Sequence, residues 1–220
     1  MPTGYRKASD LPQVIPVFPL DGALLLPGGQ LPLNIFEPRY LNMLDDAMAG
    51  DRLIGMVQTR GGGEAARPLL ADVGCVGRIT SFAETPDGRY LITLTGLCRF
   101  EIRDELPVRS PYRQVRALFA PFEEDLTSGD GEVPAADRQA FLDALRRYLD
   151  HRGMEIDWES AESAPTGALV NSLAMALPFE PAEKQALLET RTIQDRCLAL
   201  IALLEIDAAD DSDDGPHALQ

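Results

Sequence analysis

The stretch that decides the fold runs from Val17 to Tyr40 and reads VFPLDGALLLPGGQLPLNIFEPRY. It begins with two short apolar segments that are broken by glycine and proline, the residues that favour turns. Apolar residues then alternate as in a half-buried strand, at Leu31, Leu33 and Ile35. Pro38 is favoured as the first residue of a helix, so this strand leads directly into one. The stretch supplies packing and shape, and it carries no pattern of catalytic residues.

Short strands are predicted from residue 13 to about residue 120, with one helix inserted among them. The helix begins at Pro38, and Gly50 ends it. A hairpin is predicted around Pro86-Asp87-Gly88, because the glycine tolerates a positive φ and strand-like runs flank this turn. The runs with strand character are residues 14–18, 23–26, 30–35, 53–59, 79–84, 90–95, 99–102 and 114–118. Short strands with one helix favour a curled antiparallel sheet or a small barrel.

The second half of the chain, residues 134–206, is predicted to be an α-helical bundle. Runs with helical spacing cover residues 137–150, 166–177, 181–188 and 192–205. Gly153 and Pro178 follow two of these runs, and Thr192 with Asp195 has the spacing of a capping box. Residues 1–12 are expected to be flexible, residues 121–133 to form a linker, and residues 207–220 to form a disordered acidic tail. The predicted fold class is therefore α+β.

The charge and the cysteines limit the partners and the compartment. The chain has 35 acidic against 20 basic residues, a formal net charge of −15 that repels phosphate backbones and anionic membranes. No run of about 18 apolar residues occurs, and the amino end lacks a segment of signal-peptide type. The cysteines Cys75, Cys98 and Cys197 have neither zinc nor disulfide spacing. We expect a cytoplasmic protein with reduced thiols and no membrane partner.

No set of residues for catalysis, metal binding or cofactor binding stands out. Hydrolysis of the serine type usually needs a histidine as base, and His151 and His217 lie near a helix end and in the acidic tail. The lysines, Lys7 and Lys184, lack a nearby glycine-flanked serine. The sequence therefore predicts no catalytic residue, no metal and no cofactor, and an unrecognised enzyme and a small-ligand sensor stay open as alternatives.

Three blocks of motifs occur in order along the chain. The first comprises Phe18-Pro19-Leu20, Leu26-Pro27-Gly28 and Ile35-Phe36-Glu37-Pro38-Arg39-Tyr40. The second comprises Val73-Gly74-Cys75-Val76-Gly77-Arg78-Ile79, Asp87-Gly88-Arg89 and Gly96-Leu97-Cys98-Arg99-Phe100. The third comprises Ala176-Leu177-Pro178, Glu183-Lys184-Gln185-Ala186-Leu187-Leu188-Glu189 and Arg196. With these blocks, residues 13–205 resemble the amino-terminal, substrate-recruiting domain of the Lon protease family.

The resemblance implies a PUA-like antiparallel β pseudobarrel followed by helices, and a role in recognising unfolded or tagged polypeptides. Full-length Lon proteins continue into an ATPase and a protease, and we find no counterpart of either in this sequence. The resemblance therefore points to a stand-alone, non-enzymatic polypeptide-binding module. Such a module would act in trans as an adaptor for proteolysis or quality control, with a separate protease or motor as partner, or would bind polypeptides for another purpose.

Candidate binding residues are suggested by the proline-broken apolar run from Leu24 to Leu33, together with the absence of catalytic residues. An apolar groove between barrel and helices would hold the hydrophobic segments of a client polypeptide. Its predicted lining is Leu24, Leu26, Phe36 and Phe82. Core packing is the alternative for each of these residues, since large apolar side chains are most often buried.

RNA binding is the alternative function. It is supported by a cluster of arginines and by the resemblance to PUA-like folds, some of which bind RNA. The cluster comprises Arg99, Arg103, Arg109, Arg113 and Arg116. If these residues share a face, they form a basic patch for RNA or for the acidic surface of another protein. The interspersed Glu101, Asp104 and Glu105 weaken the positive field, so nucleic acid is the less favoured partner.

Overall fold

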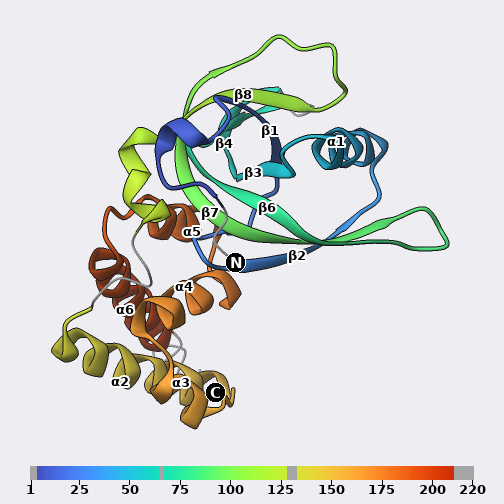
Figure 1. Ribbon diagram of the computed structural model, residues 1–220. Helices are drawn as coiled ribbons and strands as arrows, with labels where there is room; N and C mark the ends of the chain where they lie inside the picture. Colours follow the sequence, from blue (N-terminus) through green and yellow to red (C-terminus); the bar gives the residue numbers. More distant parts are fainter. Residues whose placement is uncertain (1–3, 65–66, 128–132, 211–220) are drawn as a thin grey trace. The chain divides into compact units, whose positions relative to one another are not determined.

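The computed structural model describes residues 4–64, 67–127 and 133–210 (Figure 1). The described residues fall into two compact units. The sheet unit holds the described part of Met1–Gly129 together with Met175–Glu189, and the helical unit holds the described parts of Asp130–Ala174 and Thr190–Gln220. The α+β class predicted from the sequence is confirmed.

A six-stranded sheet with the order β2-β7-β6-β3-β1-β8 forms the sheet unit. The carboxy-terminal part of β7 also pairs with β8, so the pairings run from β7 through β6, β3, β1 and β8 back to β7. This arrangement is the predicted pseudobarrel, with β2 as an additional strand on β7. A separate pair is formed by β4 and β5. The strands are β1 (Val14–Pro19), β2 (Gln30–Ile35), β3 (Leu53–Val57), β4 (Thr59–Glu64), β5 (Arg67–Leu70), β6 (Val73–Glu84), β7 (Tyr90–Glu105) and β8 (Arg113–Leu118).

One pairing departs from the predicted antiparallel pattern. Strands β1 and β3 run parallel, with Val17 opposite Gly55, and the sheet is therefore mixed. Parallel neighbours need a crossover connection, which here contains β2 and helix α1 (Pro38–Ala49). Local sequence pattern carries no signal for this choice, because either direction of β1 buries the same side chains.

Helix α1 begins and ends where the sequence predicts. Pro38 is its first residue, and the backbone N–H of Gly50 donates to the carbonyl of Ala47 at 3.1 Å. One face of the helix is buried, and its Tyr40 ring lies 4.2 Å from the ring of Phe18 in β1, centroid to centroid. The buried residues of the helix are Tyr40, Met43, Leu44 and Ala47.

Glycines of the motif blocks lie where strands and core side chains approach closely. A Cβ atom at Gly74 would lie 2.7 Å from the ring of the fully buried Phe100. A Cβ atom at Gly96 would lie 2.1 Å from the carbonyl oxygen of Leu26. These positions are therefore restricted to glycine by the space available, and they let the segment that contains Leu26 pack against the sheet.

The predicted boundary of the helical bundle differs from the observed one. Helix α5 (Pro181–Glu189), expected in the helical bundle, groups with the sheet unit. The Gln185 amide donates to the carbonyl of Val73 at 3.1 Å, and the Lys184 ammonium donates to the carbonyl of Gly22 at 2.9 Å. The helix is held to the strands by polar contacts that helical periodicity does not reveal.

The expected linker and flexible amino end are also structured where they are described. Residues Ala120–Leu126 form the 3₁₀ segment η2, whose Asp125 makes an ion pair with Arg99 of β7 at 2.8 Å. Near the amino end, η1 (Ala8–Asp10) is fixed by the backbone N–H of Ala8, which donates to Glu123 at 3.0 Å. Both segments therefore belong to the sheet unit, while residues 128–132 of the predicted linker lie outside the described residues.

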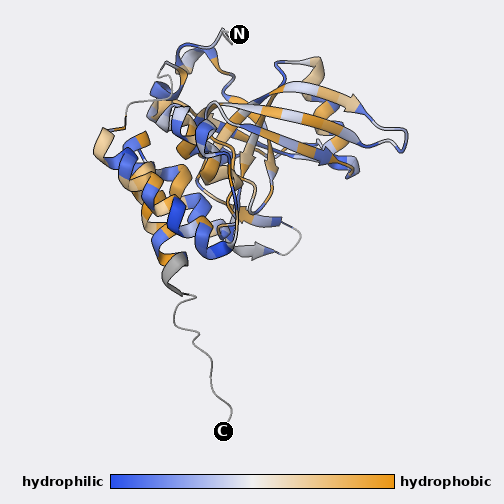
Figure 2. Cartoon of the chain, turned by 90° about the horizontal axis from the view of Figure 1, so that it is seen from below, coloured by the Kyte–Doolittle hydropathy of each residue, from blue (hydrophilic) through white to orange (hydrophobic). Residues whose placement is uncertain are grey.

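The helical unit is built from α2, most of α4, α3 and α6. Gly153 ends α2 with a φ of 61°. The predicted capping box is confirmed, because the Asp195 N–H donates to the Thr192 hydroxyl at 3.0 Å and the Thr192 N–H donates to the Asp195 carboxylate at 3.2 Å. Figure 2 shows apolar and polar residues on different sides of these helices. The helices are α2 (Ala135–Arg152), α3 (Trp158–Ser163), α4 (Thr166–Ala176) and α6 (Ile193–Asp210). Residues 207–210, predicted to belong to the disordered acidic tail, form the end of α6, and residues 211–220 of that tail lie outside the described residues.

Candidate functional site

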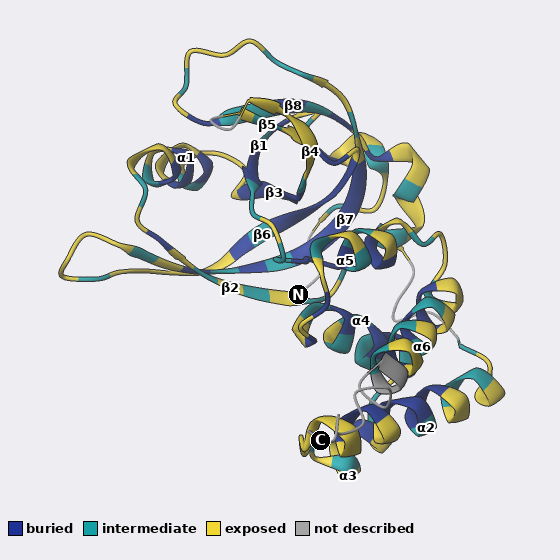
Figure 3. Cartoon of the chain, turned by 180° about the vertical axis from the view of Figure 1, so that it is seen from behind, coloured by how far each residue is buried: buried dark blue, intermediate teal, exposed yellow. Residues whose placement is uncertain are grey.

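A long β-hairpin projects from the sheet unit. Strands β6 and β7 continue past the buried part of the sheet to a turn in which the Thr85 N–H donates to the carbonyl of Arg89 at 2.9 Å. Gly88 in this turn has a φ of 79°, as the sequence pattern predicts. Figures 1 and 3 show the hairpin extending outward, with its distal part exposed while β6 and β7 are buried nearer the centre of the sheet. The exposed part is an arm that can contact other molecules.

Exposed aromatic side chains lie on this arm and at the end of the strand that borders it. Phe36 and Phe82 expose 62% and 40% of their surface. The rings of Phe82 and Tyr90 lie 4.9 Å apart, and the guanidinium of Arg89 lies 5.8 Å from the ring of Phe36. Strand β2 borders the arm, since its last residue, Ile35, lies opposite Tyr90 in the ladder. Phe36 comes directly after this strand. We call Phe36, Phe82, Arg89 and Tyr90 the aromatic surface.

The aromatic surface is tied to helix α1. The hydroxyl of Tyr90 donates to the carboxylate of Asp45 at 3.1 Å. This hydrogen bond to a carboxylate raises the pKa of Tyr90 above its ordinary value, so the phenol stays protonated and remains a donor. The contact fixes the arm beside the helix and holds its rings in place.

The four predicted groove residues divide into two pairs. Leu24 and Leu26 are 2% and 0% exposed, and they pack in the core. The adjacent carbonyl of Leu26 lies over Gly96, which shows how closely this segment approaches the sheet. Their side chains have no surface to offer a ligand, whereas Phe36 and Phe82 are exposed on the aromatic surface. The candidate site is thus restricted to these two phenylalanines and their neighbours, and their role in binding stays a prediction.

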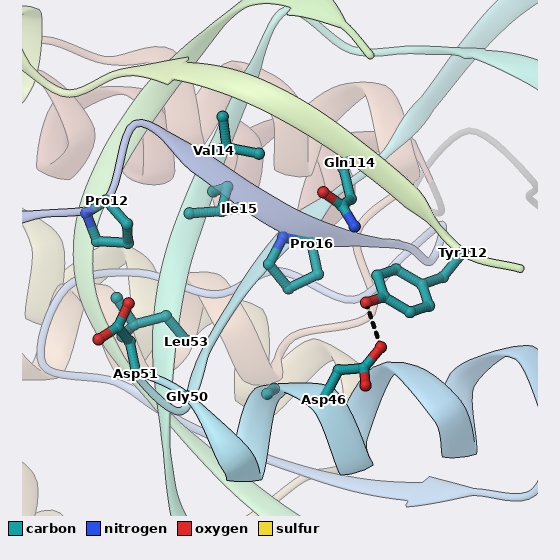
Figure 4. A pocket seen from close by; sticks show the side chains of 11 residues that line it. Pro12, Val14, Ile15, Pro16, Asp46, Gly50, Asp51, Leu53, Tyr112 and Gln114 are labelled. Atoms are coloured by element: carbon teal, nitrogen blue, oxygen red, sulfur yellow. Dashed lines mark hydrogen bonds between the residues drawn. The ribbon is translucent and has the colours of Figure 1, made fainter. Parts of the chain in front are cut away.

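A pocket of about 190 Å³ lies at the carboxy-terminal end of α1 (Figure 4). Its wall on the β8 side includes Tyr112, whose hydroxyl donates to the carboxylate of Asp46 at 2.6 Å. Burial is the larger cause, and this hydrogen bond the second cause, of the rise in the pKa of Tyr112 to about 12. The pocket is lined by Pro12, Val14, Ile15, Pro16, Asp46, Ala47, Gly50, Asp51, Leu53, Tyr112 and Gln114. Sequence analysis missed it, because its walls come from three separate parts of the chain.

The arginine cluster does not form one basic face. Arg99 is buried, and its guanidinium pairs with Asp125. Arg113 pairs with Glu105 at 2.7 Å, and Arg116 lies 3.5 Å from a carboxylate oxygen of Asp104. Acidic residues thus neutralise much of the positive charge on which RNA binding would depend.

Reactive groups of the sheet unit are occupied in structural contacts. The ammonium of Lys184 is buried and donates to the carbonyls of Gly22 and Met175, and burial lowers its pKa. The thiols of Cys75 and Cys98, like that of Cys197 in the helical unit, are buried and form no disulfide, and desolvation raises the pKa of Cys98 strongly. Within the described ranges, no group of histidine, cysteine and acidic side chains has the arrangement of a metal site. None of the described helices combines the length and apolar composition needed to cross a bilayer.

Comparison with known proteins places this architecture in a family. The family model described as the ATP-dependent protease La (LON) substrate-binding domain matches residues 14–205. The chain belongs to the family of Lon substrate-binding domains. The resemblance inferred from the motif blocks is thereby confirmed.

Individual relatives agree with the family match. The Lon protease of Roseiflexus castenholzii is 29% identical over 208 residues, which are 93% of this chain and 25% of the relative. Lon protease 2 of Myxococcus xanthus is 31% identical over 210 residues, again covering 92% of this chain and 25% of the relative. The chain therefore spans about a quarter of the length of these curated relatives.

Solved structures show the same fold. A Lon N-terminal domain protein from Xanthomonas campestris has a TM-score of 0.62 at 22% identity and covers 86% of this chain and 97% of its own. The N-terminal domain of Lon protease from the Mycobacterium avium complex has a TM-score of 0.61 at 17% identity, covering 87% of this chain and 98% of its own.

Proposed function

We propose that this chain is a non-catalytic module that binds unfolded or tagged polypeptides through the aromatic surface. The observation that carries the proposal is the exposure of Phe82 on a projecting arm and of Phe36 directly after the strand that borders this arm, in a member of a substrate-binding family. Exposed aromatic residues in a cluster are unfavourable in water, and an apolar client segment that covers them gains the corresponding free energy.

The arm suits extended, hydrophobic segments. Phe82 and Tyr90 offer ring faces and edges, against which apolar and aromatic side chains pack without needing one defined sequence. The guanidinium of Arg89, which also pairs with Asp87 at 2.9 Å, lies beside Phe36, and a cation there favours aromatic rather than aliphatic groups. We therefore expect preference for unfolded clients rich in aromatic residues.

We further propose that the module acts in trans, as an adaptor that delivers clients to a separate protease or motor in the cytoplasm. The family match is to the substrate-binding domain, and buried cysteines that form no disulfide suit a reducing compartment. The purified chain should neither hydrolyse ATP nor cleave an unfolded polypeptide. Added to a full-length Lon protease, it should change the rate at which the client is degraded. Turnover by the chain alone, abolished by one point substitution, would refute the non-catalytic role.

Photocrosslinking tests the binding surface directly. Phe36 is replaced by p-benzoylphenylalanine, and Leu118 of β8, an apolar residue that is 38% exposed outside the aromatic surface, is replaced in a matched control. A permanently unfolded polypeptide should crosslink at position 36 and not at position 118, and free aromatic peptide should compete. Equal crosslinking at both positions, or none at position 36, would contradict the proposal.

A further inference from the structure

The pocket at the end of α1 differs in chemistry from the aromatic surface. Figure 4 shows Pro12, Val14 and Pro16 on its β1 side, the carboxylate of Asp46 beside Tyr112 at one end, and the carboxylate of Asp51 near Pro12 and Leu53 at the other end. The prolines and the valine provide an apolar wall, whereas the carboxylates provide negative charge. A ligand that matches both features has a long apolar stem and a positively charged end.

Three electrostatic contributions favour the binding of a cation in this pocket. Asp46 and Asp51 form no ion pair with any described residue, although Asp46 accepts the hydrogen bond from Tyr112. The pocket also lies at the carboxy-terminal end of the twelve-residue helix α1, where the helix dipole is negative. The net charge of −15 adds a long-range attraction for basic ligands.

We propose that this pocket binds the side chain of an arginine or lysine residue of a client polypeptide. The methylenes of such a side chain would lie against Pro12 and Pro16, and its charged end would donate hydrogen bonds to Asp51, while Asp46 would add negative charge at the other end of the pocket. The inference rests on the proposed function, because it supposes a polypeptide ligand. It adds a basic residue to the aromatic ones that the client should contain.

A small probe tests the pocket independently of the aromatic surface. The full chain, labelled with ¹⁵N, is titrated with N-acetyl-arginine methylamide and with the citrulline analogue, which has almost the same shape and no charge. The arginine compound should shift the amide signals of Asp46, Gly50 and Asp51, and the citrulline compound should leave them in place. Equal shifts with both compounds would show a site for neutral groups, and the absence of shifts with both would show no site; either result overturns the proposal.

Substitution of the carboxylates tests the assigned residues. Asp51→Asn should reduce the affinity for the arginine compound about tenfold, the size expected for losing a hydrogen bond between charged groups. Asp51 is exposed, so this variant should fold normally. Asp72→Asn is the matched control, since it neutralises an exposed carboxylate that pairs with Arg60 outside the pocket. An equal loss of affinity in both variants would indicate general attraction by the acidic surface and overturn the assignment.

Peptide binding separates failure of this inference from failure of the proposed function. Two peptides of equal length carry the same aromatic residues, and one has arginine where the other has citrulline. We expect both to bind and the arginine peptide to bind several-fold more tightly, with the difference lost in Asp51→Asn. Equal affinity of the two peptides would refute the basic pocket and leave the aromatic surface supported. Absence of binding by both would refute the proposed function, and with it the inference.

Discussion

Removing the two exposed phenylalanines should weaken client binding by an amount that the structure sets. A phenylalanine presents about 200 Å² in total, so the 62% exposure of Phe36 leaves about 125 Å² for a ligand to cover. At about 25 cal/mol per Å², a ligand that covers this surface completely gains about 3 kcal/mol of binding free energy. A ligand that covers one side of the ring gains about half of that. Phe36→Ala should therefore raise the Kd about tenfold.

Substitution of Phe82 should reduce the binding free energy less than substitution of Phe36. Its 40% exposure corresponds to about 80 Å², and half cover is worth about 1 kcal/mol. The double variant Phe36→Ala/Phe82→Ala should thus raise the Kd by about two orders of magnitude if the two contributions add, and by less if the client covers both rings with one side chain.

The assay is fluorescence anisotropy with a labelled, permanently unfolded polypeptide. Thermal unfolding controls for the fold. Part of each ring is covered in the folded chain, so the melting temperature should fall, and binding is compared at a temperature at which the parent chain and the variants are fully folded. Leu69→Ala is the matched control, because Leu69 is 44% exposed in β5 and lies outside the aromatic surface. If the double variant binds as tightly as the parent chain, or if Leu69→Ala weakens binding as much, the reasoning is refuted.

Three further changes test the core. Leu26→Ala should cost about 2–5 kcal/mol in the free energy of unfolding measured with urea, because Leu26 is fully buried, and the folded fraction should still bind clients. Gly96→Ala should cost about 1–3 kcal/mol or more, since the new Cβ meets the carbonyl of Leu26 at 2.1 Å; a stable variant would contradict the close approach. Asp125→Ala should cost about 3–5 kcal/mol, as it leaves the Arg99 guanidinium buried without its carboxylate, and combining it with Arg99→Met should restore part of the loss in a double-mutant cycle.

Local signals in the sequence predicted the elements correctly where one residue type decides the structure. Pro38 and Gly50 set the limits of α1, Gly88 marks the hairpin turn, and Thr192 caps α6 through Asp195. Each of these residues acts through its own backbone or through a neighbour a few positions away, so the sequence alone contains the relevant information.

Long-range contacts account for the features that the sequence analysis did not predict. Helix α5 was placed with the bundle because its apolar spacing shows that one face is buried but not against which element; the contacts of Lys184 and Gln185 with the sheet unit decide this. The parallel pairing of β1 with β3 depends in the same way on the path of the chain.

Of the four residues predicted to line a groove, Leu24 and Leu26 are buried, and Phe36 and Phe82 are exposed. Leucine and phenylalanine are equally suited to a core and to a binding surface, so the sequence does not distinguish Leu26 from Phe36. Leu26 is buried because Gly96 leaves room for the segment around it, whereas Phe36 follows the last residue of β2 and is exposed. Tyr90 and its bond to Asp45 were missed, since the two residues lie far apart in the sequence.

The central claim is that this chain holds non-native polypeptide by an exposed aromatic surface. The most direct measurement compares one labelled client in its folded form and in a permanently unfolded form, titrated with the purified chain in the same buffer. We predict saturable binding of the unfolded form alone, weakened by Phe36→Ala. Equal binding of both forms, or binding of neither, would contradict the account.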